Sequence, residues 1–319
     1  MSYVPNLVNK LSVESYDPAA DEVKDIKIGG DPIDTVYITL SMDAVTDLPT
    51  LLQYAEVLNR VTISDKGNPV KEFTTSADLL FMAAIRARQS YNVNNHENTD
   101  PSNAFLRIPI MFGRYEYDPD LAYPVRDDQD LILSLDVDVV DVNVDNPQIG
   151  VDVLYKGNFA SKGWVKETTK TITSVATGDF PVVVPNEGKL LGIGLFSTTV
   201  PENAADTTTL NWVRFLRNNK AWWYTQAFWE WLQAGNQVRL PDAGMQFGHF
   251  HEEVVLPADT RAMENDIGAF RQYAYMDFDP LDNMLLAPDV SRDAQVGLVV
   301  NYGDTAAARM IPVSVLPPV

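Results

Sequence analysis

The chain has 319 residues, 45% of them hydrophobic, no cysteine and a formal net charge of -20. This length and composition are sufficient for one large domain or two ordinary domains with buried cores. The lack of cysteine excludes disulfides, thiolate zinc sites and cysteine nucleophiles, and the acidity disfavours binding to nucleic-acid phosphates. We therefore expect no direct nucleic-acid partner.

Two further features bear on location. The N-terminus lacks a basic start followed by an apolar block, and so does not read as a secretory signal. The longest apolar runs, at 79–85 and 180–185, are shorter than the roughly 18–20 residues that a membrane-spanning helix needs. We expect a soluble chain made in the cytoplasm, although it could still lie against a membrane.

Strand patterns dominate the chain. Period-two alternation and β-branched runs predict strands at 34–45, 58–64, 104–113, 130–144, 149–155, 170–176, 190–198, 210–216, 251–257, 273–278, 295–302 and 309–316. Only two helices are predicted. The first covers 74–90, with Thr75 or Ser76 as its N-cap, and the second covers 221–235. Many short strands separated by turns favour β-sandwiches or barrels.

An internal repeat organises these elements. A strand, a tight polar turn and a helix recur in the same order, followed by an aromatic-Asp-Pro loop and an apolar strand. The matching segments are 58–68 with 210–220, 73–82 with 224–233, and 117–135 with 278–300, and the halves end on similar strands at 149–155 and 309–316. We predict an N-terminal arm at 1–24 and two tandem barrels at 25–157 and 165–319.

The acidic stretch "LDVDVVDVNVD" at 135–145 invites a cation-site or catalytic interpretation. The spacing of an EF-hand loop fails here, because Val140 and Asp141 stand where an oxygen ligand and glycine are needed. As a strand, the stretch places its acids on one face, and the doubled valine at 139–140 predicts a β-bulge that restores the alternation. The corresponding strand of the second half, 296–304, lacks nearly all these acids. We therefore expect a solvent- or neighbour-facing edge of the first barrel, formed by Asp136, Asp138, Asp141 and Asp145, with Asn143 on the same face.

The histidines offer one candidate metal site. His249 and His251 would share a strand face, as in cupin-type jelly rolls. Glu252 and Glu253 follow too soon to act as the third ligand, no histidine follows, and the remaining histidine is the distant His96. We predict exposed strand histidines and assign no metal-ligating, cofactor-binding or catalytic residue.

Five of the tryptophans gather in the second half. They are Trp212, Trp222, Trp223, Trp229 and Trp231. On the predicted helix, Tyr224, Phe228 and Trp231 would form one stripe. Such a wide apolar face favours a core or subunit interface over carbohydrate stacking.

Tandem barrels with one helix each, in an acidic chain without cysteine or catalytic motifs, resemble the double jelly-roll major capsid proteins of tailless icosahedral viruses, the phage and adenovirus-hexon-like group. The resemblance rests on "LNRVTISDKGN" followed by "FTTSADLLFM", and on "LNWVRFLRNNK" followed by "YTQAFWEWLQ". It implies an all-β fold of two jelly rolls, each with a flanking helix. It also implies a non-enzymatic homotrimer, pseudo-hexagonal in outline, that tiles a shell.

The same resemblance implies the partners. They are neighbouring capsomers, minor capsid and penton proteins, and in many members an internal viral membrane, within a virion assembled in the host cytoplasm. The arm at 1–24 would contact neighbours or membrane. The helices at 74–90 and 221–235 would pack around the trimer or between capsomers.

Two other functions stay open from the residues alone. One is a carbohydrate-active or glycoprotein-processing enzyme on a double jelly-roll scaffold, with paired carboxylates among Glu116, Asp127, Asp128 and Asp130. The other is a lectin-like binding module without catalysis. A stable trimer would favour the capsid protein, and a monomer that hydrolyses glycans would favour the enzyme.

Overall fold

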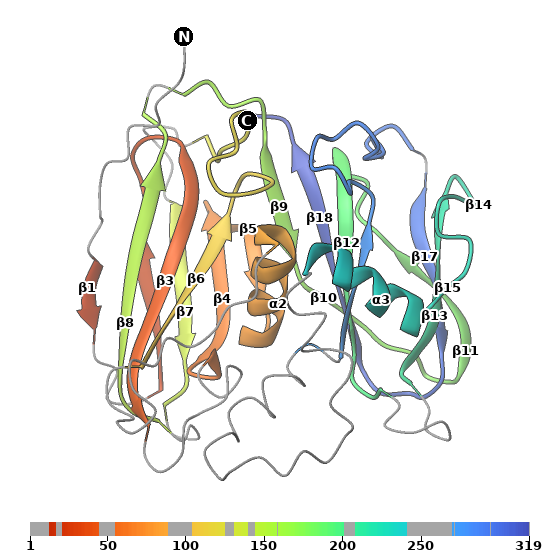
Figure 1. Ribbon diagram of the computed structural model, residues 1–319, viewed down its shortest axis with the longest axis horizontal. Helices are drawn as coiled ribbons and strands as arrows, with labels where there is room; N and C mark the ends of the chain where they lie inside the picture. Colours follow the sequence, from red (N-terminus) through yellow and green to blue (C-terminus); the bar gives the residue numbers. More distant parts are fainter. Residues whose placement is uncertain are drawn as a thin grey trace. The chain divides into compact units, whose positions relative to one another are not determined.

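The computed structural model describes residues 13–16, 21–44, 55–88, 104–124, 131–139, 144–157, 159–200, 208–240, 270, 272–293 and 295–318. The chain forms two compact units. Unit 1 comprises Met1–Val165, Asp242–Ala269 and Pro317–Val319, and unit 2 comprises Lys166–Pro241 and Phe270–Leu316. Among the described residues, each unit has two sets of paired antiparallel strands and one helix (Figure 1).

Among the described residues, unit 1 contains eight strands in two sets of four paired strands. The first sheet has the order β1 (Val13–Tyr16), β8 (Val144–Tyr155), β3 (Ile33–Ala44), β6 (Ala104–Met111). The second has the order β5 (Asn68–Phe73), β4 (Leu58–Asp65), β7 (Leu131–Val137), β2 (Glu22–Lys27). Helix α2 (Ser76–Ala87) follows β5. Strand β1 and part of β2 fall within 1–24, so part of the predicted arm contributes to the sheets.

Unit 2 repeats this arrangement. One set of paired strands has the order β10 (Lys170–Ile172), β18 (Ala308–Leu316), β12 (Lys189–Ser197), β16 (Tyr273–Asp277). The other has the order β11 (Gly178–Val183), β17 (Val296–Tyr302), β13 (Leu210–Arg217), β14 (Lys220–Ala221), with β15 (Ala227–Phe228) also paired to β13. Helix α3 (Trp229–Arg239) follows β15, and β9 (Trp164–Thr168) lies at the boundary between the units.

The order of the strands along the chain identifies the topology. In unit 1 the chain passes from β1 in one sheet to β2 in the other and back to β3, and it returns between the sheets again through β6, β7 and β8. Unit 2 follows the same path from β10 to β18. This is the eight-stranded jelly roll. The predicted fold class, two tandem jelly rolls each with a flanking helix, is confirmed.

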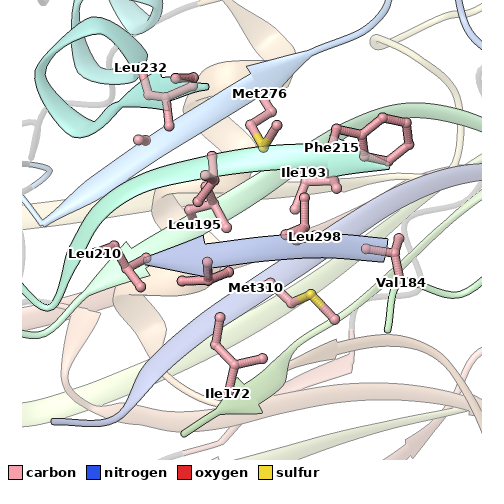
Figure 2. Close-up of a cluster of buried hydrophobic side chains, with 14 of the residues drawn as sticks. Ile172, Val184, Ile193, Leu195, Leu210, Phe215, Leu232, Met276, Leu298 and Met310 are labelled. Carbon is pink, nitrogen blue, oxygen red and sulfur yellow. The ribbon is translucent and has the colours of Figure 1, made fainter. Parts of the chain in front are cut away.

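The core of unit 2 lies between its two sheets. Ile193 and Met310 come from one sheet, Phe215 and Leu298 come from the other, and Leu232 of α3 joins them, all at most 3% exposed (Figure 2). Period-two alternation supplies these side chains, because every second residue of a strand faces inward. Helix α3 is therefore part of the barrel that it flanks.

Two matching hairpins account for the strongest part of the repeat. Lys66 and Gly67 join β4 to β5, and Asn218 and Asn219 join β13 to β14, with all four residues at positive φ. Two successive residues at positive φ form the type I′ turn, whose twist suits a two-residue hairpin. Glycine and asparagine tolerate this conformation best.

We expect Gly67→Ala to destabilise unit 1 by about 1 kcal/mol, because alanine is strained at positive φ. A Cβ at Gly67 (φ 80°) meets no atom within 4 Å, so the cost is conformational and not steric. Asn219→Gly at the matching turn of unit 2 is the control, with an expected change within about 0.5 kcal/mol. Thermal unfolding measures both, and equal effects would contradict the turn assignment.

The N-terminal boundary was predicted correctly for the first helix and wrongly for the second. Helix α2 begins after Thr75, whose hydroxyl accepts a hydrogen bond from the backbone N–H of Asp78 at 3.1 Å, as one of the two predicted N-caps. The second helix begins at Trp229, eight residues later than predicted. Residues 220–228 instead form β14 and β15 with Trp223 at φ 59° between them, because their backbone groups pair with β13. The predicted stripe through Tyr224 is therefore wrong.

The predicted strand 130–144 is also wrong in extent. Strand β7 ends at Val137, seven residues before the predicted end, and β8 begins at Val144, five residues before the strand predicted at 149–155. Residues 140–143, including the second valine of the predicted bulge, lie outside the described residues, as does the predicted strand 251–257. Strands β1, β2, β5, β9, β11, β14 and β15 were not predicted.

The register of the repeat is shifted in two segments. The helices begin 153 residues apart, at Ser76 and Trp229, and not 151 apart as the match of 73–82 with 224–233 implies. The second shift follows β6 and β16. Phe112 N donates to Asp34 O after β6, and Phe278 N donates to Leu191 O after β16. Phe278 therefore corresponds to Phe112, and the alignment of Tyr117 with Phe278 through their shared Asp-Pro is wrong. The same register places Leu191 at the position of Asp34.

Candidate functional site

Asp136 occupies an outward position on β7, where partly buried and fully buried residues alternate. The side-chain amide of Asn59 on β4 donates to Asp136 Oδ2 at 3.4 Å. In unit 2, Asn211 on β13 donates to Asn301 on β17 at 2.9 Å. A neutral amide thus replaces the carboxylate in the same outward pair. Because β7 lies between β2 and β4, Asp136 is on an outward face and not on an edge strand.

Asp138 and Asp145 are the other acids of this stretch whose backbone the structure describes. Asp138 follows the end of β7, and its backbone N–H donates to Val57 O at 3.0 Å. Asp145 lies in β8 opposite Asp43 of β3, in the other sheet. Asp141 and Asn143 lie outside the described residues. Among the described residues, no three metal-ligating side chains form a group suited to a metal ion.

Most of the residues behind the alternative functions lie outside the described part of the chain. These are His96, His249, His251, Glu252, Glu253, Asp127, Asp128 and Asp130. Glu116 is described and half-buried. Burial raises its pKa, and a hydrogen bond with Tyr37 opposes that shift. The three aspartates with which Glu116 was considered as a pair lie outside the described residues.

The tryptophans divide into buried and exposed residues. Trp229 is buried in the core of unit 2, and Trp222 packs against that core. Trp223 and Trp231 are exposed, at 44% and 74%. The five tryptophans therefore do not line one binding surface.

A network of buried charges lies at one end of unit 1. The ammonium of Lys156 lies 2.6 Å from Asp34 Oδ1, and both side chains are at most 3% exposed. The same ammonium donates to Leu121 O at 2.8 Å and to Asp118 O. One carboxylate and two carbonyl oxygens thus surround the ammonium. This is the arrangement of a structural ion pair.

Asp118 extends this network. Its carboxylate receives a two-pronged bond from Arg114, with Nε and Nη2 each 2.7 Å from an oxygen, and further bonds from the backbone N–H of Arg114 and of Asp120. Burial raises the pKa of Asp118, but these hydrogen bonds outweigh burial and hold the pKa below its usual value of 3.8. Gly113 makes room for the carboxylate, because a Cβ there would lie 2.5 Å from Asp118 Cβ.

We expect Asp118→Asn to lower the free energy of unfolding by about 3 kcal/mol at neutral pH, because it breaks a buried pair and leaves Arg114 with a longer ion pair, 3.2 Å to Asp120 Oδ2. The folded-state pKa of Asp118 is depressed, so its stabilisation is fully present above the unfolded pKa near 3.9 and is lost as pH falls through the folded pKa. Urea unfolding from pH 7 to pH 3 should therefore show wild type and variant converging below about pH 4. Asp136→Asn is the control, with little change at neutral pH, because unit 2 carries asparagine there. A gap that stays constant across this range would contradict the assignment.

Unit 2 has its own charged network around the end of α3. Arg239 binds both carboxylate oxygens of Asp277 at 2.7 and 2.9 Å, and it also donates to Asp282 Oδ1 at 3.0 Å and Asp279 O at 2.8 Å. Asn236, one turn earlier, donates to Tyr273 O at 3.1 Å and accepts from Tyr275 N at 3.0 Å. These bonds hold α3 along β16.

The arginine at the end of the helix is common to both units. Arg86 in the last turn of α2 donates to Met111 O and Gly113 O, which flank Phe112. Arg239 in the last turn of α3 binds Asp277 and Asp279 O, which flank Phe278. Both helices are thus fixed to the end of the same strand of their jelly roll. The sequence pattern alone did not reveal this match, because "AAIR" (83–86) and "NQVR" (236–239) share little beyond the arginine.

Exposed apolar side chains concentrate in unit 2. Of eleven large exposed apolar residues in the described part of the chain, seven lie between β14 and the loop after β16, namely Trp223, Phe228, Trp231, Val238, Leu281, Leu285 and Leu286. From unit 1, Val23 and Tyr117 are the only ones among the described residues. Concentrated apolar exposure on a folded protein indicates an interaction surface. No helix among the described residues is long and apolar enough to cross a bilayer.

Comparison with known proteins identifies the fold but gives no match by sequence. No protein-family model and no curated protein sequence matches the chain. Among solved structures, the chain matches the STIV MCP (TM-score 0.63, 14% identity, 96% of this chain and 95% of that chain). It also matches the major capsid protein P2 from bacteriophage PM2 (0.62, 11%, 96% and 96%). A third match is a chain of the PBCV-1 virus capsid (0.52, 11%, 98% and 96%).

The chain has the fold of these capsid proteins. Each match covers nearly the whole length of both chains, so both jelly rolls and their order are shared. The predicted resemblance to double jelly-roll capsid proteins is thereby confirmed at the level of the fold. None of these matches supports the carbohydrate-active enzyme.

Proposed function

We propose that the chain is the major capsid protein of an icosahedral virion, a structural protein and not an enzyme. The observation that carries this proposal is the match over 96% of this chain and at least 95% of two capsid proteins from different viruses. Shared folds can host unrelated functions. Here the buried charges are engaged in structural hydrogen bonds, and the exposed apolar residues of unit 2 suit a protein that functions through extended contacts.

In this proposal the chain forms a homotrimer of pseudo-hexagonal outline, and trimers tile the shell. Its partners are neighbouring capsomers, minor capsid and penton proteins, and the lipid of an internal membrane where one exists. It is located in the virion and assembles in the host cytoplasm. The boundaries 1–24, 25–157 and 165–319 and the assignment of no catalytic, cofactor-binding or metal-binding residue belong to the same proposal.

Native mass spectrometry of the purified chain tests the proposal. The expected species is three times the 35.5 kDa of one chain, with larger assemblies at high concentration visible by electron microscopy. A monomer at all concentrations would contradict the proposal. Glycan hydrolysis by such a monomer would revive the enzyme alternative.

A further inference from the structure

Helices α2 and α3 occupy matching positions but differ in exposure. The first residues of the two helices, Ser76 and Trp229, are 153 positions apart in the sequence. Arg86 and Arg239 are separated by the same interval. Under this alignment Leu79 corresponds to Leu232, and both are buried at 1% and 3%. The inward face of the helix is therefore the same in both units.

The outward face of the helix differs between the two units. On α3 it consists of Trp231, Ala234, Gly235 and Val238, which are all exposed and follow the i, i+3, i+4, i+7 spacing of one helical stripe. We call these four residues the α3 stripe. The corresponding residues of α2 are buried to 1% exposure or less, namely Asp78, Phe81, Met82 and Ile85. The same face of the same element is covered in one jelly roll and uncovered in its twin.

We infer that a second copy of this chain covers the α3 stripe. This assignment rests on the proposed trimer and names one of its contact surfaces. The twin helix shows that this face is compatible with complete burial. Phe228, 43% exposed at the N-cap of α3, extends the stripe toward β15, with its ring centroid 6.4 Å from that of Trp231.

Charge argues for a copy over a different macromolecule. The α3 stripe contains no ionisable side chain, although each chain carries a net charge of -20. Two strongly acidic copies repel least where they meet over an uncharged surface. A basic partner would instead be recognised by acidic residues, which this stripe lacks. Tryptophan is also the side chain most often found at the energetic centre of protein interfaces.

The contact between copies is heterologous, because a trimer has no two-fold axis to pair α3 with another α3. Each copy therefore presents the α3 stripe to a different surface of its neighbour, and three such contacts close a ring. Burial of Trp231 alone would remove on the order of 150 Å² from water at each contact.

Three variants test the assignment by native mass spectrometry across a dilution series. Val238→Glu places a carboxylate in the stripe, and should raise the concentration at which the trimer dissociates by at least about thirtyfold. Gly235→Arg adds a long side chain where a Cβ meets no atom of its own chain within 4 Å. It should weaken the trimer similarly while leaving the monomer at least as stable, since arginine favours helix over glycine. Val175→Glu is the matched control, at a valine 95% exposed in unit 2 outside the stripe, and should assemble as wild type does.

The outcomes separate the two proposals. If wild type forms a trimer and the Val238→Glu and Gly235→Arg variants form it equally well, the assignment of the stripe is overturned. The proposed function is unaffected by that result. Equal loss of assembly in Val175→Glu would also overturn it, because added charge anywhere would then suffice. A wild-type chain that never assembles would overturn the proposed trimer itself.

Discussion

Replacing Lys156 with methionine should destabilise unit 1 by about 3–5 kcal/mol, the largest single-residue effect that we expect in this unit. Methionine fills similar space but supplies no N–H group. The carboxylate of Asp34, 0% exposed, would lose its cation, and the carbonyl oxygens of Asp118 and Leu121 would lose a donor. A buried charge left without a partner costs far more than the intact pair contributes. Urea unfolding at one fixed protein concentration measures the effect.

Lys162→Met is the matched control. Lys162 also binds an aspartate, with Nζ 2.7 Å from Asp120 Oδ1, but its side chain is 75% exposed. Exposed pairs contribute little, so this variant should remain close to wild type. Equal losses in both lysine variants would contradict the role that we assign to burial.

Unit 2 suggests how the loss at Lys156 can be reversed. Strand pairing places Val315 at the position of Lys156, opposite Lys189 on β12. With Leu191 at the position of Asp34, the second jelly roll folds with an apolar pair where the first has charges. We therefore expect Asp34→Leu combined with Lys156→Met to be more stable than Lys156→Met alone, although Tyr117 N would lose its acceptor. Additive losses in this double-mutant cycle would contradict the coupling.

The sequence was most informative where physical constraints are local. Alternation predicted most of the longer strands, and the N-cap of α2 was one of the two residues predicted. The hairpins at Gly67 and Asn219 stood out because their turns need residues that tolerate positive φ. Short strands such as β14 and β15 carry too few residues to show a period.

The errors came where tertiary contacts decide the structure. The aromatic run around Trp222 has a helical spacing, but its backbone pairs with β13 and Trp223 adopts positive φ. The ion pair of Lys156 with Asp34 joins residues 122 positions apart on neighbouring strands, so nothing in the local pattern indicates it. The α3 stripe required the helix boundaries and the exposure of both twin helices before it could be recognised.

Arg239→Met should lower the free energy of unfolding by about 3–5 kcal/mol and should also weaken assembly of the trimer. The side chain of Arg239 is 5% exposed and faces Asp277 and Asp282, which would remain close together without a cation. The last turn of α3 would lose its bonds to the end of β16. Because the α3 stripe depends on the position of this helix, we expect lower stability of the chain together with a lower proportion of trimer.

Two companion variants distinguish charge from geometry. Arg239→Lys keeps the charge but cannot form the two-pronged bond to Asp277, so its loss should be intermediate. Arg292→Met removes an exposed arginine of the same unit and should change neither stability nor assembly. Urea unfolding measures stability and native mass spectrometry measures the proportion of trimer, both on the same samples.

Val238→Glu should lower the proportion of trimer alone, because it changes the contact surface. Arg239→Met should lower both stability and the proportion of trimer, because it changes the bonds that hold that surface in place. If the Arg239→Met variant forms the trimer as fully as wild type despite its lower stability, the trimer does not depend on the bonds that hold α3 to the end of β16.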